Sequence, residues 1–335
     1  MEYRNLGRTG VKVSPLCLGC WNFGNATDRE TSLTIIDHAL DVGVNFIDTA
    51  NMYGRGTSET IVGEALRPPN KRQRVVLATK VHFAMDDEDP NAQGNSRRHI
   101  LEQCDASLRR LQTDYIDLYQ IHRPSPDTPP DETLRALDDL VQSGKIRYIG
   151  TSTWPAWQVV ESLWVAEKLS LNRPICEQPP YHLLDRRIER ELVPMAQTYG
   201  IGIIPWAPLA SGFLTGIYQR NTAAPPGTRF EKSPETQEQR NLHSEAAFAV
   251  LDEVAAIASE KGCSPGQLAL AWNLAQPGIT APIVGPRTLD HWKGNLGALD
   301  VTVTDADRQR LDAVAPPGRM IAPYYEAQWG PRTYR

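Results

Sequence analysis

The sequence contains no long hydrophobic run. No apolar stretch in its 335 residues approaches the roughly 18–20 residues that a membrane-spanning helix needs. The opening MEYRNLGRTG also lacks the apolar core of a signal peptide. These two absences argue against a membrane protein and predict a cytosolic one.

Surplus basic charge and paired cysteines are also lacking. The chain has 35 Lys and Arg against 40 Asp and Glu, a net charge of −5, whereas a nucleic-acid surface needs a basic footprint. The cysteines number five and are scattered, which is typical of a reduced compartment. Cys17 and Cys20 form a C-x-x-C, but they lie in the apolar run LCLGC rather than at a helix start, so we interpret them as structural.

No G-x-G-x-x-G follows the first apolar run, so an open dinucleotide-binding sheet would lack its usual phosphate turn. What the chain does have is a regular alternation of short apolar runs with amphipathic segments. Eight runs read as buried strands: 15–20, 45–50, 74–80, 115–122, 146–152, 174–178, 201–207 and 280–285.

Between these runs, apolar residues recur at helical spacing of three and four. The predicted helices are 31–43, 58–67, 98–111, 131–145, 157–169, 186–200, 244–262, 265–275 and 288–299. Eight strand–helix units favour a closed (β/α)₈ TIM barrel of the α/β class, in which catalytic residues lie where strands end.

Three further segments complete the prediction of one domain over residues 1–335. YRNLGRTGVKVS indicates an N-terminal β-hairpin. Residues 208–241 read as a long loop after the seventh strand. The tail 316–335 is rich in Tyr and Trp without periodicity, and it either folds over the pocket or makes oligomer contacts.

Four polar residues fall at the strand ends. Asp48, Lys80 and His122 end the second, third and fourth strands, and Tyr53 follows the second. Each alone has an ordinary interpretation as a cap, a solvated lysine or a buried histidine, but their shared position favours function. An ammonium lowers the pKa of a nearby phenol, and a carboxylate fixes that ammonium. Asp48 and Lys80 would therefore make Tyr53 acidic enough to protonate a carbonyl oxygen that His122 polarises.

Hydride addition to a carbonyl needs a cofactor, because no side chain carries hydride. A nicotinamide site requires amide and hydroxyl partners, an aromatic face and phosphate contacts. The ends of the fifth to seventh strands offer Ser152, Thr153, Gln178 and Trp206. Residues 285–288 open a helix with a free arginine, which is a natural phosphate site.

These residues resemble the aldo-keto reductase superfamily over nearly the full chain. The stretches ICEQPPYHLLDR and PWAPLASGFLTG are more similar to the bacterial sugar and aryl reductases and the potassium-channel beta subunits than to aldose reductases. The motifs that carry the resemblance are FIDTANMYGRGTSE (46–59), TK (79–80), IDLYQIHRP (116–124), GKIRYIGTS (144–152), 174–186, 205–218 and 282–299.

The resemblance implies a catalytic tetrad of Asp48, Tyr53, Lys80 and His122, with Tyr53 as the general acid. It implies NADP(H) as cofactor, with NAD(H) less favoured, and a small carbonyl or alcohol as substrate. The cofactor-binding residues it implies are Trp21, Ser152, Thr153, Gln178, Trp206, Leu209, Ser211, Gly212, Leu214, Arg229, Gly285, Arg287, His291 and Asn295. It implies no metal ligands. Arg287 is the candidate for the 2′-phosphate.

Some positions depart from the pattern of the family. Thr153 stands where relatives often have Asn or Arg, Ile217 replaces a lysine near the phosphates, and His291 and Gly294 replace polar residues of the adenosine-binding helix. These changes weaken the case for NADPH over NADH.

Trp21, His82 and Arg123 should form the substrate wall, and the last two predict a polar, sugar-like carbonyl; Arg123 has a structural interpretation as an alternative. Two other functions remain. One is an NADP(H)-binding, redox-sensing regulatory subunit of the channel-beta type. The other, a metal-dependent barrel hydrolase, is disfavoured because one His and one Asp at the second and fourth strand ends are too few ligands.

Overall fold

Eight short parallel strands form the centre of the computed structural model, which describes residues 1–232, 242 and 244–322. The strands are β3 (Cys17–Gly19), β4 (Phe46–Asp48), β5 (Val76–Val81), β6 (Ile116–Ile121), β7 (Ile146–Ser152), β8 (Pro174–Gln178), β9 (Gly202–Ile203) and β10 (Ile283–Val284). Each pairs in parallel with its neighbour in the order β10-β3-β4-β5-β6-β7-β8-β9.

Two backbone hydrogen bonds join the edges of this sheet. Thr280 N donates to Ile203 O and Ile283 N donates to Pro205 O, both at 2.8 Å. The predicted (β/α)₈ barrel is therefore confirmed. The last two strands are shorter than the predicted runs 201–207 and 280–285. Pro205 and Pro282 interrupt these runs, and proline has no N–H to donate to the ladder.

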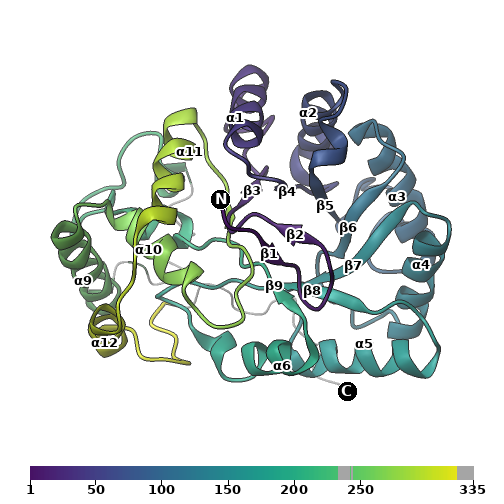
Figure 1. Cartoon of the computed structure of the whole chain (residues 1–335). Coiled ribbons are helices and arrows are strands. Elements are labelled where there is room, and N and C mark those ends of the chain that lie inside the picture. The colour runs from purple at the N-terminus through teal and green to yellow at the C-terminus, as the bar shows by residue number, and fades with distance from the viewer. Residues whose placement is uncertain (233–241, 243, 323–335) are drawn as a thin grey trace.

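Helices surround the strands (Figure 1). They are α1 (Arg29–Asp41), α2 (Thr57–Leu66), α3 (Arg97–Leu111), α4 (Pro130–Gln142), α5 (Ala156–Lys168), α6 (Leu192–Tyr199), α7 (Arg229–Lys232), α9 (Glu245–Lys261), α10 (Pro265–Leu274), α11 (Leu289–Leu296) and α12 (Asp305–Val314). Short 3₁₀ helices are η1 (Tyr53–Gly56), η2 (Arg72–Arg74), η3 (Arg187–Glu189), η4 (Ala210–Thr215) and η5 (Gly297–Asp300). None of the described helices has the length and apolarity needed to cross a membrane.

Side chains of Asp, Ser and Thr cap the starts of several of these helices. Ser96 caps α3, Ser264 caps α10 and Thr288 caps α11, each accepting a hydrogen bond from the backbone three residues on. Helix α12 was not predicted, although Thr304 and Asp307 form a capping box at its start.

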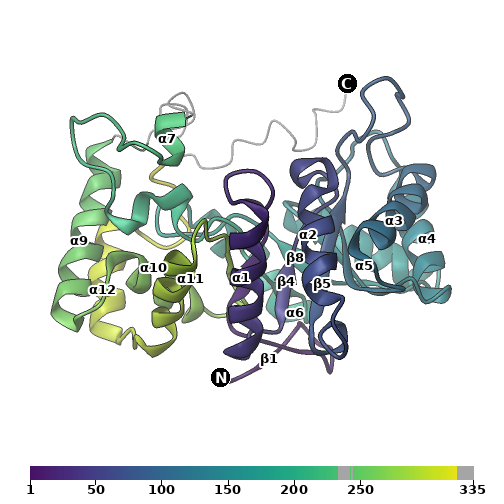
Figure 2. The same ribbon diagram turned by 90° about the horizontal axis from the view of Figure 1, so that it is seen from above.

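The predicted N-terminal hairpin is confirmed. Strands β1 (Arg4–Asn5) and β2 (Lys12–Val13) pair antiparallel, and the hairpin crosses in front of the barrel strands in Figure 1. Buried Leu6 and Val13 pack there against residues of the barrel interior. Gly7 has φ 58°, and a Cβ there would lie 2.6 Å from Ile175 O, so the close approach requires glycine. In Figure 2 the hairpin lies at the bottom and α7 at the top.

The two irregular segments are described in part. Within the predicted loop 208–241, η4 and α7 are formed, and residues 233–241 lie outside the described residues. The first residues of the predicted tail run beside the segment after β8, because Arg186 N donates to Arg319 O and Ile321 N to Leu184 O, both at 2.9 Å. The remaining tail residues, 323–335, lie outside the described part.

Candidate functional site

Three neighbouring strands bring Asp48, Lys80 and His122 to the same end of the barrel. Asp48 is the last residue of β4, Lys80 lies near the end of β5, and His122 follows β6 directly. Lys80 is paired in register with Gln120 of β6, two residues before His122. All three predicted strand-end residues are buried, and Lys80 has an exposed fraction of 0%.

Tyr53 reaches the same point from a left-handed turn. It starts η1, in which Gly54, Arg55 and Gly56 have φ values of 56°, 51° and 96°. Such values are rare outside glycine, and they reverse the chain so that α2 can begin at Thr57. The Y-G-R-G sequence is thus the local reason why the phenol turns back toward the strands.

Hydrogen bonds hold the start of α2 against three strands. Ser58 Oγ donates to Cys20 O at 2.8 Å and therefore accepts from Thr49 Oγ1 at 2.9 Å. Glu59 Oε1 accepts from Thr79 Oγ1 at 2.6 Å. The turn that carries the phenol is consequently fixed to β3, β4 and β5.

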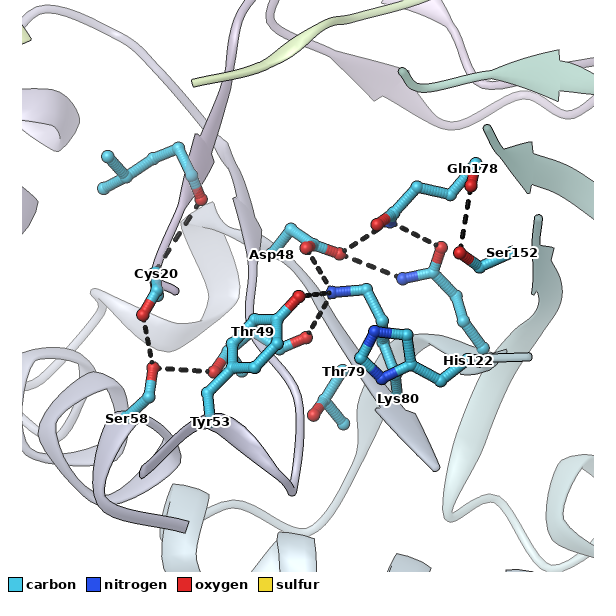
Figure 3. Close-up of polar contacts among 12 residues, drawn as sticks. Cys20, Asp48, Thr49, Tyr53, Ser58, Thr79, Lys80, His122, Ser152 and Gln178 are labelled. Atoms are coloured by element: carbon cyan, nitrogen blue, oxygen red, sulfur yellow. Dashed lines mark hydrogen bonds and ion pairs between the residues drawn. The ribbon is translucent and has the colours of Figure 1, made fainter. Parts of the chain in front are cut away.

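The ammonium of Lys80 has three acceptors, which match its three N–H groups. Nζ donates to Asp48 Oδ1 at 2.5 Å, Thr49 O at 2.8 Å and Tyr53 Oη at 3.0 Å, as Figure 3 shows. Tyr53 Oη is therefore an acceptor in this contact. Within the described residues its own O–H has no acceptor, so that proton is free for a ligand.

Burial changes the acid–base properties of this group. Burial raises the pKa of Tyr53 above its ordinary value, and the nearby Lys80 charge lowers it by less. This corrects the prediction that Lys80 makes Tyr53 acidic, because in the ligand-free protein desolvation of the phenolate outweighs the ammonium. Burial acts to lower the pKa of Lys80, but the Asp48 charge and Tyr53 more than offset it and leave that pKa raised. The pair is a neutral phenol beside a permanent cation.

His122 is held neutral beside them. Burial, followed by the charges of Lys80 and Arg123, puts its pKa well below the ordinary histidine value. Its ring centroid lies 5.8 Å from that of Tyr53. Its Nδ1 is buried without a partner among the described residues. A neutral imidazole in this position can donate a hydrogen bond to an oxygen without adding a second positive charge.

Two glutamines hold the other oxygen of Asp48. Gln120 Nε2 and Gln178 Nε2 each donate to Oδ2 at 3.0 Å, and Gln178 Nε2 also donates to Gln120 Oε1 at 3.0 Å. Gln178 was predicted as a site residue and Gln120 was not. The alternation of side chains along a strand could have identified Gln120, because it lies two residues before His122 and therefore points to the same face.

The predicted substrate wall separates into an exposed and a buried part. Trp21 is 43% exposed, and its ring lies edge-on to Tyr53 at 4.8 Å. His82 Nδ1 is 2.9 Å from Asn95 Oδ1, while Asn95 Nδ2 donates to Arg123 O at 2.9 Å. Because the amide nitrogen is engaged with Arg123, His82 Nδ1 is the donor in the first bond.

Arg123 lies between the predicted catalytic and cofactor residues. Its Nη1 donates to His122 O at 2.6 Å, Thr153 Oγ1 at 3.0 Å and Ser152 Oγ at 3.4 Å. Its guanidinium carbon is 5.9 Å from the centre of the Trp206 ring. The arginine therefore contacts the predicted carboxamide partners directly, a relationship that the sequence did not indicate.

The predicted nicotinamide partners meet at the ends of β7, β8 and β9. Ser152 Oγ donates to Gln178 O at 2.9 Å, and Trp206 N donates to Pro179 O at 2.9 Å. Thr153 has φ 63°. A β-branched residue with positive φ is a genuine outlier, and such strain costs about 1–3 kcal/mol and clusters at functional sites.

The predicted pyrophosphate segment forms the tight turn η4. Ser211 and Gly212 have φ 58° and 92°, and Gly212 N donates to Leu209 O at 2.9 Å. Leu214 is buried in the hydrophobic core, so its backbone rather than its side chain is what it presents to a ligand. Leu209 packs against that core.

The predicted adenosine-end residues form a separate group around the start of α11. Thr27 Oγ1 donates to Arg287 O at 3.0 Å, and Arg287 Nη1 donates to Gly227 O at 2.5 Å. Arg229 begins α7, two residues after Gly227. Gly285 lies before the helix, where Asn22 Nδ2 contacts its carbonyl at 2.9 Å; His291 and Asn295 are on the helix itself. Among the described residues, no hydrogen bond joins His291 or Asn295 to the strand-end group.

In the part of the chain that the structure describes, no three or more His, Cys, Asp or Glu side chains are grouped so as to hold a metal ion. The described cysteines are all free thiols. Cys17 and Cys20 are buried, and burial raises the pKa of both.

Known proteins resemble this chain along nearly its whole length. Residues 15–316 match the Aldo/keto reductase family model. An uncharacterized oxidoreductase, YrpG, from Bacillus subtilis is 40% identical over 94% of this chain and 96% of its own length. A probable voltage-gated potassium channel subunit beta from rice is 40% identical over 90% and 92%. The versiconal hemiacetal acetate reductase of Aspergillus parasiticus is 38% identical over 93% and 96%.

Proposed function

This chain belongs to the aldo/keto reductase family, and from that premise we propose that it is an NADP(H)-dependent enzyme that reduces an aldehyde or ketone to an alcohol. Tyr53 is the general acid, Lys80 and Asp48 control its charge environment, and His122 polarises the carbonyl. The proposal concerns a small-molecule substrate.

The observation that carries the proposal is the hydrogen bonding of Lys80. Its three N–H groups are all engaged, and one of them points at Tyr53 Oη. The phenol must therefore direct its own proton elsewhere. The raised pKa of Tyr53 keeps that proton in place near neutral pH, as a proton donor requires.

The residues act on the carbonyl oxygen. A bound nicotinamide cofactor supplies the hydride that the carbonyl carbon receives. As negative charge develops on the oxygen, Tyr53 transfers its proton to it, and the adjacent Lys80 ammonium stabilises the phenolate that remains. Neutral His122 donates a hydrogen bond to the same oxygen. Asp48 holds Lys80 in place, and Gln120 and Gln178 hold Asp48.

The chemistry at the strand ends fits the nicotinamide end of a cofactor. Both hydrogens of Gln178 Nε2 are used on Asp48 and Gln120, so Oε1 is the atom with which the amide can accept from a carboxamide NH₂. Ser152 and Thr153 add hydroxyl groups, and Trp206 and Trp21 add aromatic faces. This donor and acceptor set supports a nicotinamide rather than a free phosphate.

The other cofactor residues suit the charged end. The left-handed turn at Ser211 and Gly212 is of the kind whose N–H groups bind phosphate oxygens, with Leu209 and Leu214 on either side. Arg229 and Arg287 belong to segments joined at Gly227 and provide positive charge for a 2′-phosphate. This charge favours NADP(H) over NAD(H). Gly285, His291 and Asn295 would contact the adenosine.

A polar, sugar-like carbonyl is the substrate class that the wall supports. His82 and Arg123 are polar groups beside the catalytic residues, and the burial of Arg123 increases its effect on a charged or hydroxylated substrate. Kinetics of Arg123→Ala with polar and apolar aldehydes test this. Loss of the preference for polar aldehydes supports the idea, and unchanged relative kcat/KM between the two classes contradicts it.

A second candidate is a redox-sensing regulatory subunit, because two relatives in plants and one in fission yeast are named as potassium channel beta subunits. Such a protein would bind NADP(H) and show no turnover with external carbonyls. Turnover therefore distinguishes the two candidates.

The deciding experiment is a panel of aldehydes, ketones and alcohols with NADPH and NADH in turn, with cofactor binding measured in parallel by fluorescence. Carbonyl reduction with a preference for NADPH supports the enzyme. Tight NADPH binding without turnover across the panel supports the regulatory subunit. Absence of binding to either nicotinamide cofactor contradicts both.

A further inference from the structure

We propose that Glu177 is a positioning residue that holds the turn after β7 in the conformation that presents Ser152 and Thr153 to the cofactor. This inference rests on the proposed nicotinamide site. Glu177 lies next to Gln178 on β8 and, because side chains alternate along a strand, points to the opposite face. It therefore acts on the site through the turn and does not touch the cofactor.

Both oxygens of the Glu177 carboxylate are attached to residues of this turn. Oε2 accepts from Thr151 Oγ1 at 2.5 Å, and Oε1 accepts from Trp154 N at 3.0 Å. These two donors bracket Ser152 and Thr153. The strained backbone of Thr153, with φ 63°, is thus held on both sides, at Thr151 and at Trp154.

The donors around Glu177 explain why an acid occupies a fully buried position. A hydroxyl and a backbone N–H both need acceptors, and an ionised carboxylate is the side chain of this length that only accepts. No salt bridge among the described residues includes Glu177, and its two oxygens accept from a hydroxyl and a backbone N–H. A buried charge is costly unless it is paired or hydrogen-bonded, so the ionised carboxylate depends on both of these bonds to the turn.

Burial, more than any other effect, raises the pKa of Glu177, to about 7, and the hydrogen bonds from Thr151, Trp154 and the Thr153 backbone, with the Arg123 charge, lower it by less. Arg123 is the charged group whose field reaches Glu177, and Cys176 is its titratable neighbour on β8. Protonation near neutral pH removes one acceptor and the negative charge. The hydrogen bonds from Glu177 then hold the turn less firmly at the point where Ser152 and Thr153 contact Arg123.

A glutamine at this position would mimic the protonated acid without a change in shape. Thr151 Oγ1 also lies 3.4 Å from Cys176 O, so its proton can turn to that carbonyl and its oxygen can accept from the new amide. Glu177→Gln should consequently fold while lacking the second acceptor. In wild type, acid should produce the state that the variant holds at every pH.

The first experiment measures the Kd of NADPH for wild type and Glu177→Gln from pH 5.5 to 8.5. We expect the wild-type Kd to increase several-fold as the pH falls through about 7, and the variant to keep the weaker value throughout, so that the ratio of the two Kd values approaches one in acid. Titration of the cofactor phosphate affects both proteins alike and cancels in that ratio. Thr151→Ser, which keeps the hydroxyl, and Glu167→Gln on the exposed face of α5 are controls that should follow wild type.

A ratio that does not change with pH overturns the inference while leaving the proposed function intact. If wild type binds no nicotinamide cofactor, the proposed function fails, and a second measurement then decides on Glu177. Amide hydrogen exchange of the peptide covering 151–156 should be several-fold faster in Glu177→Gln, with peptides from the interior of α3 unchanged. Equal exchange in the two proteins shows that Glu177 does not hold the turn.

Discussion

Gln178 Nε2 donates a hydrogen bond to Asp48 Oδ2 at 3.0 Å, which links the end of β8 to the end of β4 through the barrel interior. Asp48 in turn contacts Lys80, and Lys80 contacts Tyr53. Two side chains, Asp48 and Lys80, thus connect Gln178, which is proposed to meet the nicotinamide, to Tyr53, the proposed proton donor. Cofactor binding and proton transfer share one hydrogen-bonded network.

This network predicts different kinetic effects for its two glutamines. Gln178→Leu should raise the Kd of the cofactor and lower kcat, because it removes both a carboxamide acceptor and a donor to Asp48. Gln120→Leu should lower kcat by about tenfold with little change in cofactor Kd, since a hydrogen bond to a charged group contributes about 1.5–3 kcal/mol. Steady-state kinetics and cofactor titration measure the two effects. Identical profiles for the two variants would contradict the assignment.

Removal of Lys80 alone should lower the free energy of unfolding more than removal of both Lys80 and Asp48. Lys80→Met leaves the buried Asp48 carboxylate without its cation, and breaking such a pair typically costs about 3–5 kcal/mol. The double variant Lys80→Met with Asp48→Asn removes the stranded charge and should be more stable than Lys80→Met alone. Urea unfolding at pH 7 compares them. A double variant that is less stable than the single would argue against a buried charged pair.

Titration of Glu177 should make the free energy of unfolding fall as the pH rises, because the pKa of Glu177 is raised in the folded protein. Its pKa is about 7 in the folded protein against a reference of 4.5, because the desolvation cost of the ionised carboxylate exceeds the effect of its hydrogen bonds to the turn. Its net contribution to the unfolding free energy is therefore most favourable below the reference value and is lost as the pH rises through about 7. Relative to wild type, Glu177→Gln should therefore gain roughly 3 kcal/mol between pH 4.5 and pH 8. The difference in unfolding free energy at the two pH values measures this. A difference that stays constant would show that Glu177 titrates normally.

The left-handed turn after Tyr53 should tolerate no side chain at Gly56. Its φ is 96°, and a Cβ would lie 2.5 Å from Arg110 Cδ. Gly56→Ala should lower kcat/KM at least tenfold, because movement of about 1 Å at a reacting group is enough for such losses. Gly10→Ala in the N-terminal hairpin is the matched control, since no atom lies within 4 Å of a Cβ there and its φ is not positive. Equal activity of the two variants would show that the turn does not place Tyr53.

The strands, and the polar residues at their ends, could be predicted from the sequence because those signals are local. Continuous apolar runs gave all eight strands, and a polar residue at the end of a run is visible in one dimension, as with Asp48 and Lys80. Proline shortened β9 and β10, and their reduced length could have been expected from Pro205 and Pro282. The predicted direction of the Tyr53 pKa shift was wrong, because the burial that raises this pKa depends on the residues around the phenol in space.

The contacts of Arg123 and Gln120 could not be read from the chain. Arg123 meets Ser152 and Thr153 from 29 and 30 residues away, and only the register of β6 on β7 brings them together. The hydrogen bonds of Glu177 were missed for a similar reason, because its donors Thr151 and Trp154 lie on and just after the neighbouring strand β7. The assignment of cofactor residues to α11 remains a prediction.

The most direct measurement is the reaction of Tyr53→Phe with a carbonyl that the wild type reduces. Loss of the proton donor should lower kcat/KM by about 10²–10⁴-fold, while the Kd of NADPH stays within about twofold of wild type, since the phenol is proposed to act on the substrate oxygen and not on the cofactor. Thermal unfolding of the variant checks that Lys80, which loses one acceptor, remains in a folded protein. Wild-type kcat/KM in a folded Tyr53→Phe would contradict the proposal that Tyr53 protonates the carbonyl.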